Sequence, residues 1–204
     1  MIPEPSDANP DLPRARTARV DVLLPGSLSS TGGGVASSCT LVRDAGRIIV
    51  VDPGMAPGQA AILDPLRALG LEPADVTDVV ISHHHPDHTI NVGLFGEAAV
   101  HDHWATYKGV VWDDAEADRR ELAPSVRLLH VPGHTAEDIA TVVGTADGVV
   151  VLTHLWWSAE GPPEDPLAED AAAVHVGRER VLAIADRIIP GHGPSFEPGA
   201  DTPR

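Results

Sequence analysis

Residues 82–88 read Ser-His-His-His-Pro-Asp-His and contain the pattern HxHxDH at His83, His85, Asp87 and His88. In an extended loop, alternate side chains point the same way, so His83 and His85 are expected to converge on one ion while Asp87 and His88 turn toward a second. The proline within the motif disfavours helix at the residue before it, which favours a loop. Imidazole ligands suit first-row transition metals better than Mg or Ca, so the stretch predicts a metal site.

Two later histidines lie in similar surroundings. Residues 126–131 and 187–189 read as strands, and each is followed by a Pro-Gly pair and a histidine, His134 and His192. A strand that ends in a glycine-containing turn places the next side chain at the edge of a sheet, where catalytic loops lie. We therefore expect both histidines to reach the HxHxDH loop, which a short buried strand at residues 78–82 precedes.

These motifs resemble the metallo-β-lactamase superfamily, and the resemblance extends over residues 20–196. The shared landmarks are an Asp-x-Gly turn after a strand, the HxHxDH loop, and single histidines in GHT and GHG contexts. They are Asp52, Gly54, His83, His85, Asp87, His88, His134 and His192. The resemblance implies an α/β fold, namely an αββα four-layer sandwich in which helices flank two mixed β-sheets.

The chain departs from the superfamily at one landmark. Many members carry an aspartate on a later strand that bridges two metals, whereas the corresponding run at residues 149–157 offers His154. A carboxylate can bridge two ions and offset their repulsion, but neutral imidazole has one lone pair. We expect His154 to be a terminal ligand of one metal or a hydrogen-bond donor to the attacking water, or alternatively a buried histidine that touches no metal.

The predicted mechanism is metal-assisted hydrolysis. Zinc bound by His83, His85 and His134 lowers the pKa of a water toward 7, and the resulting hydroxide attacks a carbonyl or phosphoryl centre. A second ion would be held by Asp87, His88 and His192, and Asp87 could also shuttle a proton as a catalytic residue. One or two zinc ions are expected, with iron or manganese as alternative metals.

Three further residues are candidates for supporting roles. Asp52 occupies the Asp-x-Gly position and is expected to orient a metal-binding histidine, although a simple turn-forming role is the alternative. Trp156 and Trp157 follow His154 directly, and one of them is expected to line an aromatic wall of the substrate pocket. Core packing or loop anchoring is the alternative for both tryptophans.

Within the superfamily, the chain resembles members like metallo-β-lactamase-domain-containing protein 1. The shared stretches are residues 85–95, 132–134 and 178–196. The animal protein is regarded as a nuclease acting on histone pre-messenger RNA, which makes a metal-dependent phosphodiesterase or nuclease one alternative function. It keeps the aspartate that His154 replaces here, so its substrate carries over only weakly.

Charge argues against a nucleic-acid substrate. The chain has 14 basic and 30 acidic residues, a net charge of -16, and no basic stripe. Affinity for nucleic acid comes largely from Lys and Arg that neutralise phosphates. The preferred substrate is therefore a small ester, thioester, lactone or related acyl compound. A mononuclear iron redox enzyme and a non-catalytic metal-binding module are the remaining alternatives.

Length and composition predict a single domain. A chain of 204 residues with 43% apolar content can bury one core. We expect a flexible leader at residues 1–19, the metallo-β-lactamase-like domain at 20–197 and a tail at 198–204, with helices near 59–69 and 168–186. The absence of an apolar spanning run or an export signal predicts a cytoplasmic protein, monomeric or homodimeric, without membrane partners. Its composition suggests a bacterial source.

Overall fold

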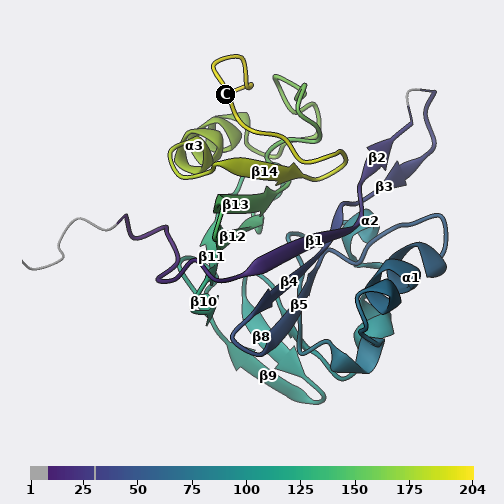
Figure 1. The fold of residues 1–204 in the computed structure, drawn as a ribbon. Helices are drawn as coiled ribbons and strands as arrows, with labels where there is room; N and C mark the ends of the chain where they lie inside the picture. The colour runs from purple at the N-terminus through teal and green to yellow at the C-terminus, as the bar shows by residue number, and fades with distance from the viewer. Residues whose placement is uncertain (1–8, 30) are drawn as a thin grey trace, which may run out of the picture.

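Seven strands form the larger of two facing β-sheets, in the order β1-β4-β5-β6-β7-β8-β9 (Figure 1). The computed structural model describes residues 9–29 and 31–204. The strands are β1 (Arg19–Leu24), β4 (Cys39–Asp44), β5 (Arg47–Val51), β6 (Asp78–Val80), β7 (Ala99–His101), β8 (Ala105–Lys108) and β9 (Val111–Asp114). β5, β6 and β7 run parallel and the other neighbours are antiparallel, so this sheet is mixed.

The smaller sheet has five strands in the order β10-β11-β12-β13-β14. They are β10 (Glu121–Ala123), β11 (Val126–His130), β12 (Ile139–Thr145), β13 (Gly148–Thr153) and β14 (Arg187–Pro190). Only the β13–β14 pair is parallel, so the second sheet is mixed as well. A separate two-stranded hairpin joins β2 (Ser27–Leu28) to β3 (Val35–Ala36).

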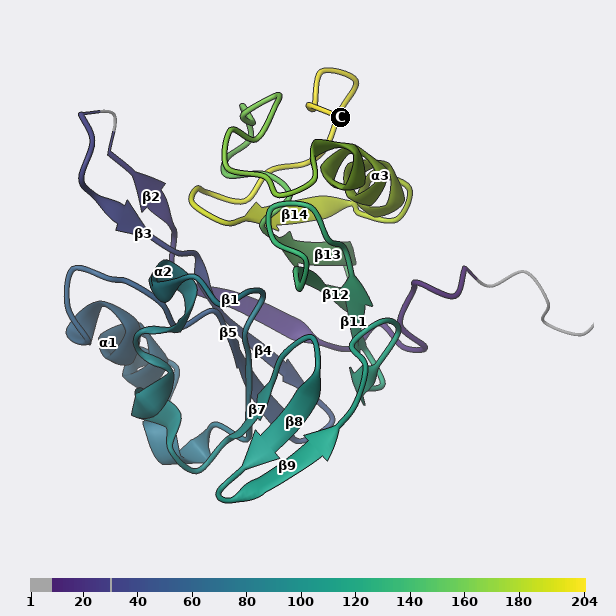
Figure 2. The same cartoon turned by 180° about the vertical axis from the view of Figure 1, so that it is seen from behind.

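Five helical segments occur in the described residues, and the two longest cover the outer faces of the two sheets. They are α1 (Ala60–Ala68), η1 (Pro73–Asp75), α2 (Pro86–Thr89), η2 (Val92–Phe95) and α3 (Ala171–Leu182). Figures 1 and 2 show α1 beside the larger sheet and α3 beside the smaller one, on opposite sides of the molecule. The predicted αββα four-layer sandwich with two mixed sheets is confirmed.

Alternation along the strands explains the layers. On β5, Ile49 and Val51 pack into the core between the two sheets, whereas Val50 packs with Ile62 and Leu66 of α1. Successive side chains of a strand point to opposite faces, so a continuous apolar run supplies two cores at once. The smaller sheet also contributes apolar side chains to two cores. Its inner face packs against the larger sheet, and its outer face forms a third apolar cluster with α3.

The helices are shorter than expected at both predicted positions. The helix predicted near 59–69 covers Ala60–Ala68 and includes Pro65. The helix predicted at 168–186 begins only after Asp170, whose carboxylate accepts hydrogen bonds from the backbone N–H groups of Ala172 and Ala173. An aspartate in this capping position satisfies amide groups that lack partners within the helix, which fixes where the helix begins.

The predicted leader is too long. Residues 1–8 lie outside the described residues, but Asp11 is buried and pairs with Arg119 and Arg180. Further along, the Ala18 backbone N–H donates to the Gly144 carbonyl, and the Ala18 side chain joins the core between the sheets. Residues 9–19 are therefore part of the domain, because ion pairs and apolar contacts hold them to it.

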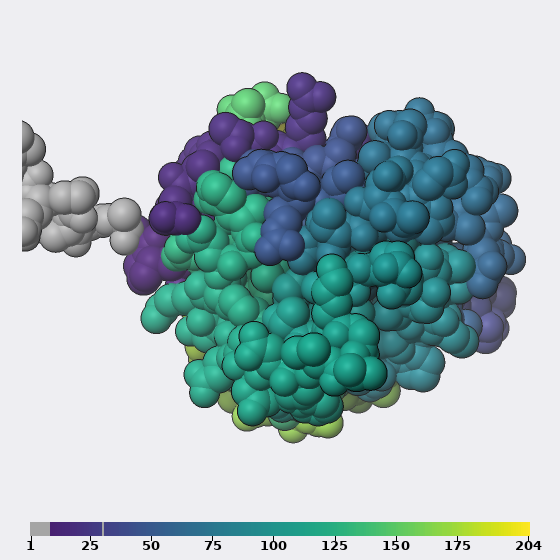
Figure 3. Space-filling model, turned by 90° about the horizontal axis from the view of Figure 1, so that it is seen from below, coloured from purple at the N-terminus to yellow at the C-terminus, as the bar shows by residue number. Residues whose placement is uncertain are grey.

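The last residues of the chain also contact the domain. The Pro203 carbonyl accepts a hydrogen bond from the Trp156 indole, and Arg204 pairs with Glu179 of α3. Seen from below, the surface is formed mostly by residues coloured blue to teal, which belong to the larger sheet and the segments beside it (Figure 3). Among the described residues, none of the helices is sufficiently long and apolar to span a bilayer.

Candidate metal centre

The predicted metal ligands all follow the carboxyl ends of strands. His83 and His85 follow β6, and Asp87 and His88 lie on the single turn of α2. The other loops follow β11, β13 and β14 and carry His134, His154 and His192. Strands that run in the same direction end at the same edge of a sheet, and β11, β13 and β14 share a direction. The two edges meet, and we call the resulting group the histidine cluster (His83, His85, His88, His134, His154 and His192).

Three ring nitrogens of the first triad converge on one point. His85 Nδ1 lies 3.1 Å from His83 Nε2 and 3.1 Å from His134 Nε2. A ring nitrogen carries either one proton or one lone pair, so His85 Nδ1 can form a good hydrogen bond with only one of these neighbours. A cation accepts all three lone pairs together, and the three residues lie close enough to hold one.

Contacts behind the first triad orient its rings. His134 Nδ1 donates to the Asp165 carboxylate at 2.7 Å, and His83 Nδ1 lies 3.1 Å from Ser82 Oγ. Asp138 is 3.6 Å from the same His83 nitrogen. Because the Nδ1 atoms are engaged on the outside, the Nε2 atoms of both rings face the point of convergence. Such outer contacts fix the tautomer and direction of metal-binding histidines.

The second triad is built in the same way. His88 Nδ1 donates to the Asp52 carboxylate at 2.9 Å, and His192 Nδ1 donates to the Ala36 carbonyl at 3.0 Å. Their Nε2 atoms lie 3.5 and 3.6 Å from Asp87 Oδ2. His88 Nε2 is buried and has no hydrogen-bond partner among the described residues, as expected of an atom that binds an ion. The predicted contact of Asp52 with a histidine of the site is present.

His154 occupies the middle of the histidine cluster. Its ring centroid lies 4.2 Å from that of His134, 4.7 Å from His83, 4.9 Å from His88 and 5.0 Å from His192. His154 Nε2 is 3.0 Å from His192 Nε2, while His154 Nδ1 is buried and forms no hydrogen bond within the part of the chain that the structure describes. His154 belongs to two of the residue groups that could hold an ion, one with His83 and His88 and one with His134 and Asp165. The chain therefore places an imidazole between the two triads.

Burial keeps most of these rings neutral. Desolvation, reinforced by neighbouring histidines, lowers the pKa of His83 and of His154 far below the usual value, and burial lowers the pKa of His192 as well. Burial is the largest single influence on His134 and disfavours its charged form, but the hydrogen bond to Asp165 and the charges of nearby carboxylates together outweigh burial, and the pKa of His134 is raised. Neutral imidazole is the form that ligates metals.

Two glycines permit the close packing of the site. A Cβ atom on Gly191 would lie 2.4 Å from Cδ2 of the His154 ring, and one on Gly54 would lie 1.7 Å from the Asp87 carbonyl oxygen. Both distances are far below van der Waals contact, so any side chain there would displace the candidate ligands. The glycines of the Pro-Gly-His and Asp-x-Gly motifs are thus needed for close approach as well as for turns.

The two tryptophans have different positions. Trp156 is completely buried and packs with Leu129, Val174 and Phe196 in the apolar cluster beneath α3. Its predicted place in the substrate pocket is therefore wrong, because the strand end turns this side chain into the core. The Trp157 ring centroid lies 6.4 Å from those of His134 and His154, so this residue borders the histidine cluster.

Two carboxylates at the site were missed in the sequence. Asp138 follows His134 by four residues, and burial raises its pKa to about 7. Its oxygens accept hydrogen bonds from the backbone and hydroxyl of Thr135, so the GHT motif with an aspartate four residues after the histidine was a usable signal. Asp165 lies in an irregular loop, 31 positions from the histidine it contacts, and no local pattern marks it.

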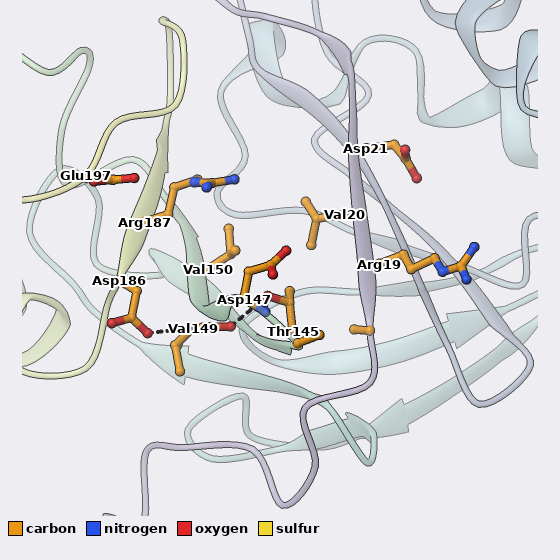
Figure 4. Close-up of a pocket in the computed structure, with 13 residues that line it drawn as sticks. Arg19, Val20, Asp21, Thr145, Asp147, Val149, Val150, Asp186, Arg187 and Glu197 are labelled. Atoms are coloured by element: carbon orange, nitrogen blue, oxygen red, sulfur yellow. Dashed lines mark hydrogen bonds between the residues drawn. The ribbon is translucent and has the colours of Figure 1, made fainter.

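A groove of about 660 Å³ lies away from the histidine cluster (Figure 4). It is lined by the start of β1, the β12–β13 turn and the start of β14, at the opposite ends of β13 and β14 from His154 and His192. Arg19, Arg187, Asp147 and Glu197 bring charges of both signs to its rim. Its lining contains none of the cluster residues, so the groove is separate from the candidate metal centre.

Comparison with known families agrees with this geometry. The profile described as the metallo-beta-lactamase superfamily matches residues 32–196. The chain belongs to the metallo-beta-lactamase superfamily. Metallo-beta-lactamase domain-containing protein 1 of Xenopus laevis is 35% identical over 189 residues, which span 87% of this chain and 80% of the relative. The human protein of the same name is 38% identical over 156 residues, 72% of this chain and 59% of its own length.

Other superfamily relatives are named as hydrolases. A hydroxyacylglutathione hydrolase of Albidiferax ferrireducens is 29% identical over 117 residues, covering 55% of this chain and 44% of the relative. Among solved structures, an N-acyl homoserine lactone hydrolase with product bound at its catalytic metal centre superposes with a TM-score of 0.63 at 20% identity, over 87% of this chain and 93% of that one. At this identity the superposition shows the shared fold. This chain is thus a member of a family of metallo-beta-lactamase-fold hydrolases.

Proposed function

We propose that this protein is a zinc-dependent hydrolase that cleaves small ester, thioester or lactone substrates. The observation that supports this most strongly is the convergence of the first triad, in which His85 Nδ1 lies 3.1 Å from both His83 Nε2 and His134 Nε2. No arrangement of protons satisfies all three nitrogens, whereas a cation does. The second triad of Asp87, His88 and His192 lies beside it and provides a second place for an ion.

The chain's own residues have distinct roles in this proposal. His83, His85 and His134 hold one ion, and Asp87, His88 and His192 hold the other. A bound zinc ion supplies hydroxide at neutral pH, since it lowers the pKa of water toward 7. The Asp87 side chain is partly exposed, so the carboxylate oxygen that does not face the His88 and His192 nitrogens can take a proton from the reacting water and release it to solvent.

His154 distinguishes this site from one with a bridging carboxylate. Its Nε2 points toward His192 at 3.0 Å, which favours a role as terminal ligand at the second ion. An imidazole adds no negative charge between two cations, so the repulsion between them is not offset. The second ion is therefore held more weakly than the first, and manganese or iron can compete for it.

The charge of the chain favours a small acyl substrate. A net charge of -16 repels a long polyanion, and carboxylates of Asp87, Asp138 and Asp165 line or support the site. Relatives named as hydrolases of hydroxyacylglutathione and of N-acyl homoserine lactone act on acyl compounds. Trp157, which borders the histidine cluster, offers an apolar surface to the acyl group.

Elemental analysis combined with a substrate panel tests the proposal. Freshly purified protein is analysed for zinc, iron and manganese, and then assayed with chromogenic ester, thioester, lactone, lactam and phosphodiester substrates. The variant His85→Ala is expected to lose turnover, while His175→Ala, on the exposed face of α3, keeps it. Hydrolysis of acyl substrates that depends on His85 supports the proposal.

Each other outcome contradicts it in a different way. Turnover of phosphodiesters alone indicates the phosphodiesterase or nuclease alternative. Iron with a spin-resonance signal and no hydrolysis indicates redox chemistry. Bound metal without turnover on any substrate of the panel indicates a binding module.

A further inference from the structure

We propose that Arg178, a buried residue of α3 outside the histidine cluster, is a positioning residue that holds His134 in its metal-binding orientation. It acts through residues 155–170, which we call the clamp segment. The inference rests on the proposed function, since it assumes that His134 binds an ion. It does not depend on which substrate is cleaved.

Arg178 holds the first half of the clamp segment. Its Nε donates to the Leu155 carbonyl at 2.9 Å, Nη1 to the Pro163 carbonyl at 2.6 Å and Nη2 to the Pro162 carbonyl at 2.8 Å. The residue is 1% exposed, and its guanidinium lies 5.5 Å from the Trp156 ring centroid. Three nitrogens of one rigid plane thus fix carbonyls that are up to eight residues apart in the chain.

The second half of the clamp segment holds the turn that carries His134. Asp165, two residues after Pro163, accepts the Nδ1 proton of His134 at 2.7 Å. The backbone N–H of Glu169 donates to the His134 carbonyl at 3.2 Å, and the N–H of Asp170 donates to the Gly133 carbonyl at 2.9 Å. The clamp segment therefore contacts both the ring and the backbone of His134.

The chemistry of these contacts explains why a guanidinium is required. A buried cation is costly unless it is paired or hydrogen-bonded, and here three of the five guanidinium N–H groups donate to backbone carbonyls, with no ion pair to a carboxylate among the described residues. Lysine has a compact ammonium group and cannot present the same planar fork to three carbonyls. Without the fork, the Pro162 and Pro163 carbonyls are free to move, and Asp165 moves with them.

A purely structural role for Arg178 makes a different prediction. In that case its loss lowers the thermal stability of the whole domain and leaves the affinity of the folded protein for zinc unchanged. Arg180, on the same helix, provides a matched control. It pairs with Asp11 and Asp118 and binds the His130 carbonyl, and within the described part of the chain none of its hydrogen bonds goes to the clamp segment.

The test compares zinc affinity in four proteins: wild type, Arg178→Gln, Arg178→Lys and Arg180→Gln. Affinity is measured by competition with a chromophoric chelator, and the His134 Nδ1 proton is followed by NMR on histidine-labelled protein. We expect Arg178→Gln to bind the tighter zinc ion roughly tenfold more weakly and to show a weaker His134 Nδ1 proton signal. Loss of a contact behind a metal ligand commonly lowers metal affinity by at least this much. The zinc affinity of Arg178→Lys is expected to lie between those of wild type and Arg178→Gln, and the affinity of Arg180→Gln is expected to match that of wild type.

Equal affinity in wild type and both Arg178 variants overturns the inference, and so does an equal loss in Arg180→Gln. If Arg178→Gln does not fold, the comparison of Arg178→Lys with Arg180→Gln decides. Failure of the proposed function is a separate result, because then wild-type protein itself binds no zinc.

Discussion

Asp165 accepts the Nδ1 proton of His134 at 2.7 Å, and both side chains are almost completely buried. Burial is the largest single influence and would raise the pKa of the Asp165 carboxyl, but the hydrogen bond from His134, the Leu167 backbone N–H and the other favourable contacts together hold the pKa below its ordinary value. The carboxylate stays charged, fixes the tautomer of the ring and makes the opposite nitrogen a better ligand. The pair couples an irregular loop to the first triad of the metal centre.

Replacing Asp165 by alanine is expected to lower zinc affinity at the first triad. The His134 ring loses its outer partner, and such losses weaken metal binding by about 10- to 100-fold. Chelator competition measures the change. Glu164→Ala is the matched control, because Glu164 is the exposed neighbour in the same loop. Unchanged affinity in Asp165→Ala would show that the pair does not support metal binding.

Replacing His154 by aspartate is expected to strengthen binding of the second ion. The His154 ring lies between the two triads, so a carboxylate there can reach both ions and offset their repulsion. Zinc titration followed by calorimetry should show a second site tighter by roughly tenfold, a gain of about 1.4 kcal/mol. His154→Ala, which removes the imidazole without adding a charge, should not show this gain. A second site no tighter in His154→Asp than in His154→Ala would contradict the role assigned to position 154.

The convergence of the candidate ligands could be predicted from the sequence because its signals are local. The HxHxDH loop and the two Pro-Gly-His turns place His83, His134 and His192 at strand ends, and the structure brings these strand ends together. The layers were predictable for a similar reason, since alternation along each strand decides which face it buries.

The missed features depend on tertiary contacts. Asp165 lies in a loop without periodicity, and only the folded chain brings it to His134. Trp156 and Trp157 are adjacent and chemically identical, so the sequence did not distinguish the one that faces the core from the one that borders the site. The error at residues 9–19 has the same origin, because the partners of Asp11 lie more than 100 positions away.

The two tryptophans are expected to respond differently to truncation. Trp156→Ala removes a completely buried ring and should cost about 3–5 kcal/mol of unfolding free energy. Trp157→Ala should cost much less, because this residue is partly exposed, and should instead raise KM for substrates with an apolar acyl group. Urea denaturation and steady-state kinetics on both variants separate these effects. A loss of stability in Trp157→Ala as large as in Trp156→Ala would place both rings in the core.

Removal of metal is expected to destabilise the protein as well as inactivate it. The histidine cluster joins loops from both sheets, so an ion bound only by the folded state adds RT ln(1 + [L]/Kd), about 2.7 kcal/mol when free zinc is 100 times Kd. Thermal unfolding with EDTA, and again after zinc is restored, should show a reversible fall in Tm. In His85→Ala, the unfolding curves measured with EDTA and with restored zinc should differ much less in Tm than they do in wild type. Identical Tm values for the wild type in both conditions would count against a resident ion.

The Asp11 ion pairs predict how stability depends on acid. The hydrogen bond from Arg180 is the main cause that lowers the pKa of Asp11; burial opposes it and Arg119 adds to it. The folded-state pKa therefore lies below the unfolded value of about 3.9. The stabilisation that the charged Asp11 carboxylate gives the folded state is fully present above about pH 4, and it is lost as the pH falls through the folded-state pKa.

Asp11→Asn should consequently cost about 1–3 kcal/mol at pH 7, the size of a hydrogen bond to a charged group that is largely buried. The difference in unfolding free energy between wild type and variant should shrink between pH 4 and pH 2, because the wild-type carboxylate is then protonated too. Asp64→Asn, at an exposed position on α1, serves as the control and should show little difference at any pH. A difference for Asp11→Asn that stays constant down to pH 2 would mean that the ion pairs contribute nothing through their charge.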